Sequence, residues 1–105
     1  EIVLRLPKNL APIKIAILPL SKKPELQAIA QPLLQDLSKK FTIQYDETGS
    51  IGKRYRRQDE IGTPYCVTID FDSLEDKQVT VRDRDTMAQE RISIDQLQSY
   101  FSERL

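Results

Sequence analysis

The residues with the clearest chemical potential form two clusters of charge. The first is "GSIGKRYRRQDEIG" (49–62), where two glycines precede a run of lysine and arginine that ends in two acids. The second is "TVRDRD" (80–85), where Arg82, Asp83, Arg84 and Asp85 alternate in sign. Such side chains bind phosphates, read the edges of nucleic-acid bases, or only solvate a surface.

A phosphate-binding loop of the Walker type is excluded by spacing. That motif requires two glycines five positions apart, followed by lysine and a hydroxyl residue. Here Gly49 and Gly52 are three positions apart, and Arg54 follows Lys53. The dinucleotide-binding fingerprint fails on the same glycines. The cations of this segment therefore need another explanation.

A helical wheel at 100° per residue separates the segment after Ser50 into two arcs. One arc carries its less polar residues: Ile51, Tyr55, Gln58 and Gly62. The opposite arc carries its charged residues: Lys53, Arg56, Arg57 and Glu60, with Arg54 at its edge. This pattern predicts an amphipathic helix that ends at Gly62, with the basic residues on its exposed face.

Two interpretations of that exposed face remain open. In the first, the charges neutralise one another at helical neighbour spacing, Arg56 with Asp59 or Glu60 and Arg57 with Glu60. In the second, one or two cations contact an RNA backbone, for which Lys53, Arg54 and Arg56 are the candidates.

The segment 80–85 places donors and acceptors together at a predicted strand end. Arginine donates a bidentate fork to a base edge or a phosphate, and aspartate accepts from the exocyclic amine of cytosine or guanine. We predict contacts with unpaired bases through Arg82, Asp83, Arg84 and Asp85. The alternative is two local ion pairs, which contribute little to stability at a surface.

Composition narrows the remaining chemistry. The 105 residues suit one domain, and sixteen basic and sixteen acidic residues cancel, so a pervasive basic field is absent. Cys66 is the single cysteine and histidine is missing, which excludes an internal disulfide and leaves no usual general base. We interpret Cys66 as an inert, structural thiol. Acidic pairs such as Asp70 with Asp72 are interpreted as turn and surface residues, so no metal site is predicted.

The hydrophobic pattern predicts eight elements. Strands are expected at 13–20, 41–45, 64–71, 78–82 and 89–93, and helices at 24–40, 51–62 and from 94 onward. Pro32 is expected to kink the first helix or to start a second short turn, and Ser93 with Gln96 is a capping-box signature for the last. This order predicts an α/β fold with a mixed sheet covered on both faces.

The chain is expected to contain one folded unit and a lead-in. Residues 1–12 are predicted to be an extended lead-in from an upstream domain, and residues 13–105 the folded domain. The first residue is Glu1 rather than methionine, which suggests a fragment of a longer protein. No apolar run reaches the length of a membrane span, and we expect a cytoplasmic location.

Three long segments resemble one known family. "LAPIKIAILPL", "YDETGSIGKRYRRQDEIGTPYCVTIDFD" and "VTVRDRDTMAQERI" resemble the C-terminal anticodon-binding domain of glycyl-tRNA synthetase, of the dimeric class II type. The resemblance covers almost the whole chain. It implies the fold of the class IIa synthetase anticodon-binding domains, a three-layer arrangement with a mixed five-stranded sheet flanked by three helices.

The resemblance also implies a function. The domain is expected to dock on the anticodon arm of glycine tRNA, beside its own catalytic domain in a homodimeric parent enzyme, with no role for DNA or a membrane. ATP and Mg²⁺ belong to that catalytic domain, so this chain is expected to need no cofactor and to be inactive alone. The competing hypothesis is a non-catalytic interaction module of the same fold, such as a polymerase accessory subunit domain or a synthetase-like regulator.

Overall fold

The computed structural model describes residues 11–105. Most of the predicted lead-in, residues 1–10, lies outside the described residues. The described chain runs through these elements: β1 (Ile15–Pro19), α1 (Pro24–Ser38), β2 (Ile43–Tyr45), α2 (Ile51–Ile61), β3 (Tyr65–Ile69), α3 (Ser73–Asp76), β4 (Gln78–Asp83), β5 (Gln89–Ser93), a short 3-10 helix (Ile94–Gln96) and α4 (Leu97–Arg104). The predicted order of strands and longer helices is confirmed.

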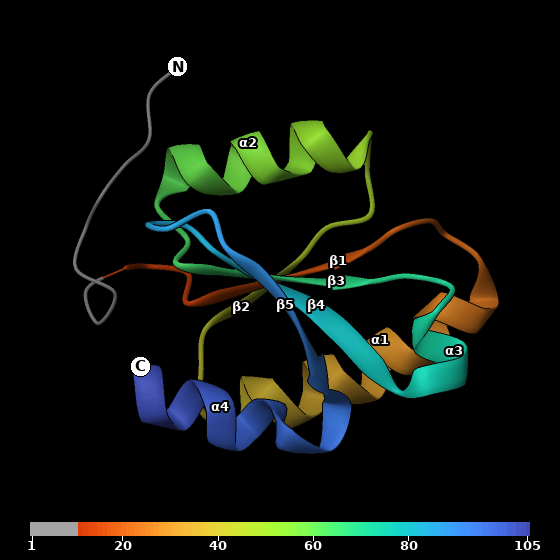
Figure 1. Ribbon diagram of the computed structural model, residues 1–105. Coiled ribbons are helices and arrows are strands. Elements are labelled where there is room, and N and C mark those ends of the chain that lie inside the picture. Colours follow the sequence, from red (N-terminus) through yellow and green to blue (C-terminus); the bar gives the residue numbers. More distant parts are fainter. Residues whose placement is uncertain (1–10) are drawn as a thin grey trace.

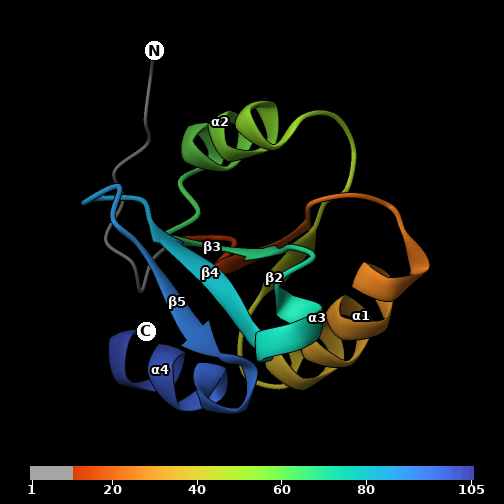
Figure 2. The ribbon, with the colours of Figure 1, turned by 45° about the vertical axis from the view of Figure 1, so that its right-hand side comes forward.

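The five strands form one mixed sheet in the order β2-β1-β3-β4-β5. β1 lies parallel to β2 and β3, whereas β4 is antiparallel to both β3 and β5. Figure 1 shows α2 alone on one face and α1 with α4 on the other, and Figure 2 shows the same three layers from another side. The predicted three-layer α/β fold is therefore confirmed.

The two faces of the sheet are packed differently because side chains alternate along each strand. Ile15 and Ile17 of β1 and Val67 of β3 point into the main core, together with the apolar stripes of α1 and α4. The intervening residues Ala16 and Cys66 face α2 in a second, much smaller apolar cluster. Leu18 of β1 belongs to the same cluster, and Ile51 and Tyr55 of α2 pack against it.

Several predicted element ends differ from the structure. α1 continues through Pro32 as one helix. Pro32 has no N–H to donate to the Ala28 carbonyl oxygen, but both residues lie on the exposed side, where water can bind that oxygen instead. β3 ends at Ile69, so Phe71 is exposed rather than on a strand face. Ser93 makes no capping hydrogen bond with its side chain, and a 3-10 helix precedes α4.

The acidic turn "DSLEDK" contains a helix that the sequence pattern did not predict. The Asp70 Oδ1 atom accepts hydrogen bonds from the backbone N–H and the hydroxyl of Ser73, each at 3.1 Å. These bonds hold the start of the four-residue helix α3, which leads directly into β4.

Candidate nucleic-acid interface

Helix α2 has the predicted ends. The Ser50 hydroxyl accepts a hydrogen bond from the Lys53 N–H at 3.3 Å, which caps the first turn. Gly62 adopts a left-handed conformation with φ of 82° and closes the last turn, which a residue with a Cβ would do only under strain. Gly49, before the helix, also has a positive φ of 85°.

The face that α2 turns toward the sheet is polar, which corrects the wheel-based prediction. Arg54, Gln58 and Asp59 are all buried there. The helical wheel took the less polar arc of α2 as the buried one. Large polar side chains nevertheless fit under this helix, because Ala16 and Cys66 leave room above the sheet. The basic residues of α2 therefore divide between an inner and an outer face.

Arg54 is 1% exposed and joins three strand-end carbonyls. Its guanidinium donates to the carbonyl oxygens of Pro19, the last residue of β1, and of Leu20, the next residue. It also donates to the carbonyl oxygen of Asp46, just after β2, at 2.9 Å. The expectation that Arg54 lies at the exposed face is wrong. A side chain so enclosed stabilises the carboxyl ends of β1 and β2 and offers no surface to an RNA backbone.

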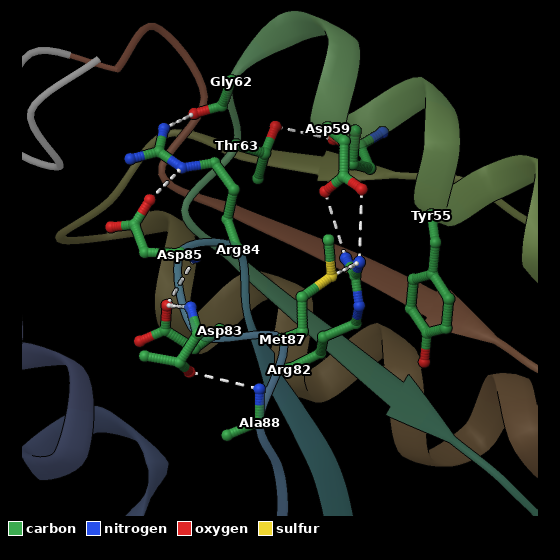
Figure 3. A network of polar contacts seen from close by, with 12 residues as sticks. Tyr55, Asp59, Gly62, Thr63, Arg82, Asp83, Arg84, Asp85, Met87 and Ala88 are labelled. Atoms are coloured by element: carbon green, nitrogen blue, oxygen red, sulfur yellow. Dashed lines mark hydrogen bonds and ion pairs between the residues drawn. The ribbon is translucent and has the colours of Figure 1, made fainter. Parts of the chain in front are cut away.

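Arg82 forms a bidentate ion pair with Asp59. Its two terminal nitrogens lie 3.1 and 3.2 Å from the two carboxylate oxygens of Asp59, and the side chains are 9% and 5% exposed. Figure 3 shows this pair joining α2 to the end of β4, beside the Tyr55 ring. Asp59 therefore pairs with a residue 23 positions away. The predicted pairing of Asp59 with Arg56 is not formed.

The electrostatics of the Arg82 site favour the charged guanidinium. Burial by itself would lower the pKa of Arg82, but the hydrogen bonds and the negative charge of Asp59 outweigh that effect and raise it. Arg82 also lies 4.8 Å from the centre of the Tyr55 ring, which favours the cation further. Arg82 is thus fixed in place as a cation throughout the physiological pH range.

The rest of the charged segment 82–85 is organised around the turn between β4 and β5. Arg84 is 2% exposed, and its Nη1 atom donates to the Gly62 carbonyl at 2.7 Å. The Arg84 Nε atom donates to Asp85 at 2.9 Å. Asp83 accepts the backbone N–H of Asp85 at 2.8 Å (Figure 3). The structure thus brings together all four predicted base-contact residues, and of these the Asp85 side chain is the most open to solvent.

The outer face of α2 carries the remaining cations. Lys53, Arg56, Arg57 and Glu60 line a shallow depression of about 280 Å³. Arg57 pairs with Asp46 at 2.9 Å, rather than with Glu60 as predicted. Lys53 and Arg56 are exposed, as predicted.

Two further residues of this region were missed by the sequence analysis. Asp59 was assigned to the exposed face, and only a contact between distant segments reveals its role. Met87 was not considered, although it lies half-exposed on the β4–β5 turn and accepts a hydrogen bond from Arg82 through its sulfur, at 2.9 Å (Figure 3). No local pattern around either residue indicated these contacts.

Cys66 has the environment of an inert thiol. It lies on β3, buried beneath α2, and this burial raises the pKa of the Cys66 thiol to about 12. At pH 8 the thiolate would be about one part in ten thousand, and the thiolate is the reactive form. The sulfur is therefore unsuited to nucleophilic chemistry.

We expect the native domain to react negligibly with Ellman's reagent at pH 8. Full reaction of one thiol is expected only after unfolding in guanidinium chloride, because unfolding removes the burial that raises the pKa. Rapid labelling of the native protein, at a rate similar to that of the unfolded chain, would contradict the inert assignment.

Two other kinds of feature are missing from the described part of the chain. Within residues 11–105, no group of three His, Cys, Asp or Glu side chains is arranged to hold a metal ion. In the same range, none of the helices combines the length and the apolar character that a bilayer-spanning helix requires.

The sequence and the fold match a known class of domain. A family model described as "Anticodon binding domain" matches residues 14–104. The chain belongs to this anticodon-binding domain family. Among solved structures, the RNA binding domain of threonyl-tRNA synthetase from Cryptosporidium parvum is similar with a TM-score of 0.83 and 29% identity, covering 94% of this chain and 25% of that one. A prolyl-tRNA synthetase structure from the same organism shares the fold, with a TM-score of 0.89 at 23% identity over 95% of this chain and 22% of that one.

Two curated relatives of the whole domain have the same name. The chain is 62% identical over 104 residues to the "Glycine--tRNA ligase" of Bifidobacterium longum, and 67% identical over 99 residues to that of Ruminiclostridium cellulolyticum. These alignments cover 98% and 94% of this chain but 21% of each relative. The chain thus spans about a fifth of the length of the curated relatives it matches.

Proposed function

We propose that this chain is the anticodon-binding domain of a glycine–tRNA ligase and docks on the anticodon arm of glycine tRNA. The observation that carries the proposal is the 58–67% identity to glycine–tRNA ligases over at least 94% of the chain. Related synthetase domains at lower identity share only the fold, so the strength of this match favours the glycine-specific type.

The geometry supports docking on RNA at the side of the sheet that α2 covers. Lys53 and Arg56 are exposed on the outer face of α2 and can approach phosphates. Phosphate contacts fix the orientation of a nucleic acid without reading its sequence. The β4–β5 turn is tied to the C-terminal half of the same helix through Arg82 and Asp59. A tRNA arm lying on α2 would therefore present its unpaired bases to this turn.

Within this proposal the residues of segment 82–85 have different tasks. Arg82 and Arg84 donate to groups of the domain itself, so they act on RNA chiefly by holding the turn in place. Asp85 carries the more exposed carboxylate and is the proposed acceptor for an exocyclic amine of an anticodon base. Asp83 supports it by accepting the Asp85 backbone N–H.

The catalytic chemistry is assigned to other parts of the parent protein. Binding of ATP and Mg²⁺ and transfer of glycine would occur in a catalytic domain outside this chain, and the described residues supply no step of that reaction. A homodimeric parent and a cytoplasmic location remain predictions of the same proposal. Gel filtration with light scattering on the full-length parent tests the first.

The deciding experiment compares glycylation by the full-length parent with and without residues 13–105. We expect single substitutions in the anticodon to lower kcat/KM of the intact enzyme by about five- to a hundredfold, the range of one lost base contact. Removal of the domain should abolish this sensitivity while glycine-dependent pyrophosphate exchange continues. If both forms discriminate anticodons equally, or the intact parent does not glycylate tRNA, the domain is an interaction module of another kind.

The outer face of α2 gives a separate prediction. Replacing Lys53 or Arg56 with alanine should raise KM for tRNA about three- to tenfold, because each change removes one phosphate contact. The slope of log KM against the logarithm of the salt concentration should fall by roughly one. The effect should be the same for cognate and anticodon-substituted tRNA.

Lys40→Ala is the matched control for this prediction. Lys40 is an exposed cation that comes shortly after α1 in the chain, and α1 covers the face of the sheet opposite α2 (Figure 1). Equal effects of Lys40→Ala and Lys53→Ala would show that only the net charge matters. That outcome would remove α2 from the docking surface.

A further inference from the structure

Met87 occupies an unusual position at the tip of the β4–β5 turn. Its side chain is 50% exposed and belongs to neither apolar cluster of the domain. Its backbone is left-handed with φ of 63°, and Lys77 is the other non-glycine residue in residues 11–105 with a positive φ. Hairpin turns usually place glycine or asparagine where such a conformation is needed. A large apolar side chain here costs stability and contributes nothing to the core.

This exposed side chain is nevertheless held in place. The Met87 sulfur accepts a hydrogen bond from Arg82 Nη2 at 2.9 Å, and the Met87 N–H donates to the Asp83 carbonyl at 2.8 Å. Arg82 is itself fixed by Asp59 (Figure 3). A chain of contacts therefore runs from α2 through Arg82 to the thioether. The side chain gains a defined position without being buried.

Strained, exposed and anchored residues cluster at binding sites, where the conformation serves the ligand. A thioether is polarisable and packs well against flat rings. An unpaired base needs an apolar surface on which to stack, with polar groups nearby to meet its edge. The Met87 side chain offers that surface, and the Asp85 carboxylate lies on the same turn.

We propose that Met87 is the platform on which one unpaired base of the anticodon loop stacks, held in position by the Arg82–Asp59 pair. This inference rests on the proposed function, and it names a contact residue for that function. The ligand is a nucleobase in single-stranded RNA, recognised by its flat face. Sequence discrimination is left to the neighbouring carboxylate and to main-chain groups of the turn.

The test is Met87→Gly in the full-length parent enzyme, with Lys77→Gly as its matched control. Both changes replace a left-handed non-glycine residue with glycine, so both should leave the melting temperature unchanged or a few degrees higher. Only Met87→Gly should lower kcat/KM for glycine tRNA, by about five- to tenfold, through loss of stacking. Met87→Leu should stay within about twofold of wild type, because it keeps the apolar surface.

A scan with single abasic nucleotides through the anticodon identifies the stacked base. A tRNA that lacks the base at that position should be a poor substrate for the wild-type enzyme. Wild type and Met87→Gly should use this tRNA equally well, because the stacking contact between the base and residue 87 is absent in both cases. The inference is overturned if Met87→Gly uses intact tRNA as well as wild type does while the enzyme still discriminates anticodons. It is also overturned if Met87→Gly lowers the melting temperature, which would indicate a structural role. If wild type itself ignores the anticodon, the proposed function fails with it.

Discussion

Replacing Asp59 with alanine is expected to lower the free energy of unfolding of the domain by about 3–5 kcal/mol. The physical reason is the charge left behind: the Arg82 guanidinium is 8% exposed and would lose both carboxylate oxygens that it contacts. A buried cation without its partner keeps the full cost of its removal from water. Urea unfolding of the 105-residue chain, followed by far-UV circular dichroism, measures the change.

The neighbouring residue supplies the control. Glu60 follows Asp59 on the same helix, carries the same charge and is exposed, so Glu60→Ala should change stability by no more than about 0.5 kcal/mol. A double replacement of Asp59 and Arg82 by leucine should recover much of the loss, because it removes both buried charges together. A small effect of Asp59→Ala, within the range of Glu60→Ala, would contradict the assignment of the pair as a structural link.

Replacing Arg54 with methionine is expected to cost about 3 kcal/mol of stability. Methionine keeps the apolar stem of the side chain but removes every donor to the carbonyls of Pro19, Leu20 and Asp46. These carbonyls end neighbouring parallel strands, and hydrogen bonds from a charged donor contribute about 1.5–3 kcal/mol each before the cost of burying the guanidinium is considered. The same urea titration measures the result.

Arg56→Met tests whether the effect of Arg54→Met comes from burial or from charge. Both arginines lie on α2, two positions apart, but Arg56 is exposed, so its replacement should leave stability within about 0.5 kcal/mol of wild type. Equal losses in the two variants would mean that the net charge of the helix matters more than its buried contacts. If both variants kept the stability of wild type, water would have replaced the Arg54 guanidinium beneath the helix.

The two largest expected effects thus concern charged residues that stabilise the proposed docking surface from within. The inner face of α2 holds β1, β2 and β4 through Arg54 and Asp59, and the outer face leaves Lys53 and Arg56 exposed. A ligand-binding helix needs such support, because contacts placed about an ångström wrongly lose much of their value.

Much of the fold was predictable from local pattern. The apolar run at β1 and the alternation in β4 indicated a buried and a half-buried strand, and the helical stripe of α1 indicated its buried face. Gly62 was recognised as the residue that ends the helix α2, and it has a positive φ. These features depend on residues close in sequence, where period and turn chemistry act directly.

The candidate site was harder to predict because its contacts are distant in sequence. Arg54 contacts residues more than thirty positions earlier, and Asp59 contacts Arg82 23 positions later. A helical wheel ranks the arcs of one helix by polarity and contains no information about the sheet face that opposes it. Here that face carries the small residues Ala16 and Cys66, which leave room for polar side chains of α2. The prediction therefore placed Arg54 and Asp59 outside when both lie within.

The sequence by itself determined the family resemblance, the order of elements and the apolar core, because each depends on residue identity and spacing along the chain. Only the tertiary structure decided which charges of "GSIGKRYRRQDEIG" face the sheet and which face solvent. It also decided that Arg82 supports the turn and that Met87 stands exposed at its tip. The physical reason is that burial and ion pairing between distant segments depend on the packed surface, which no single segment specifies.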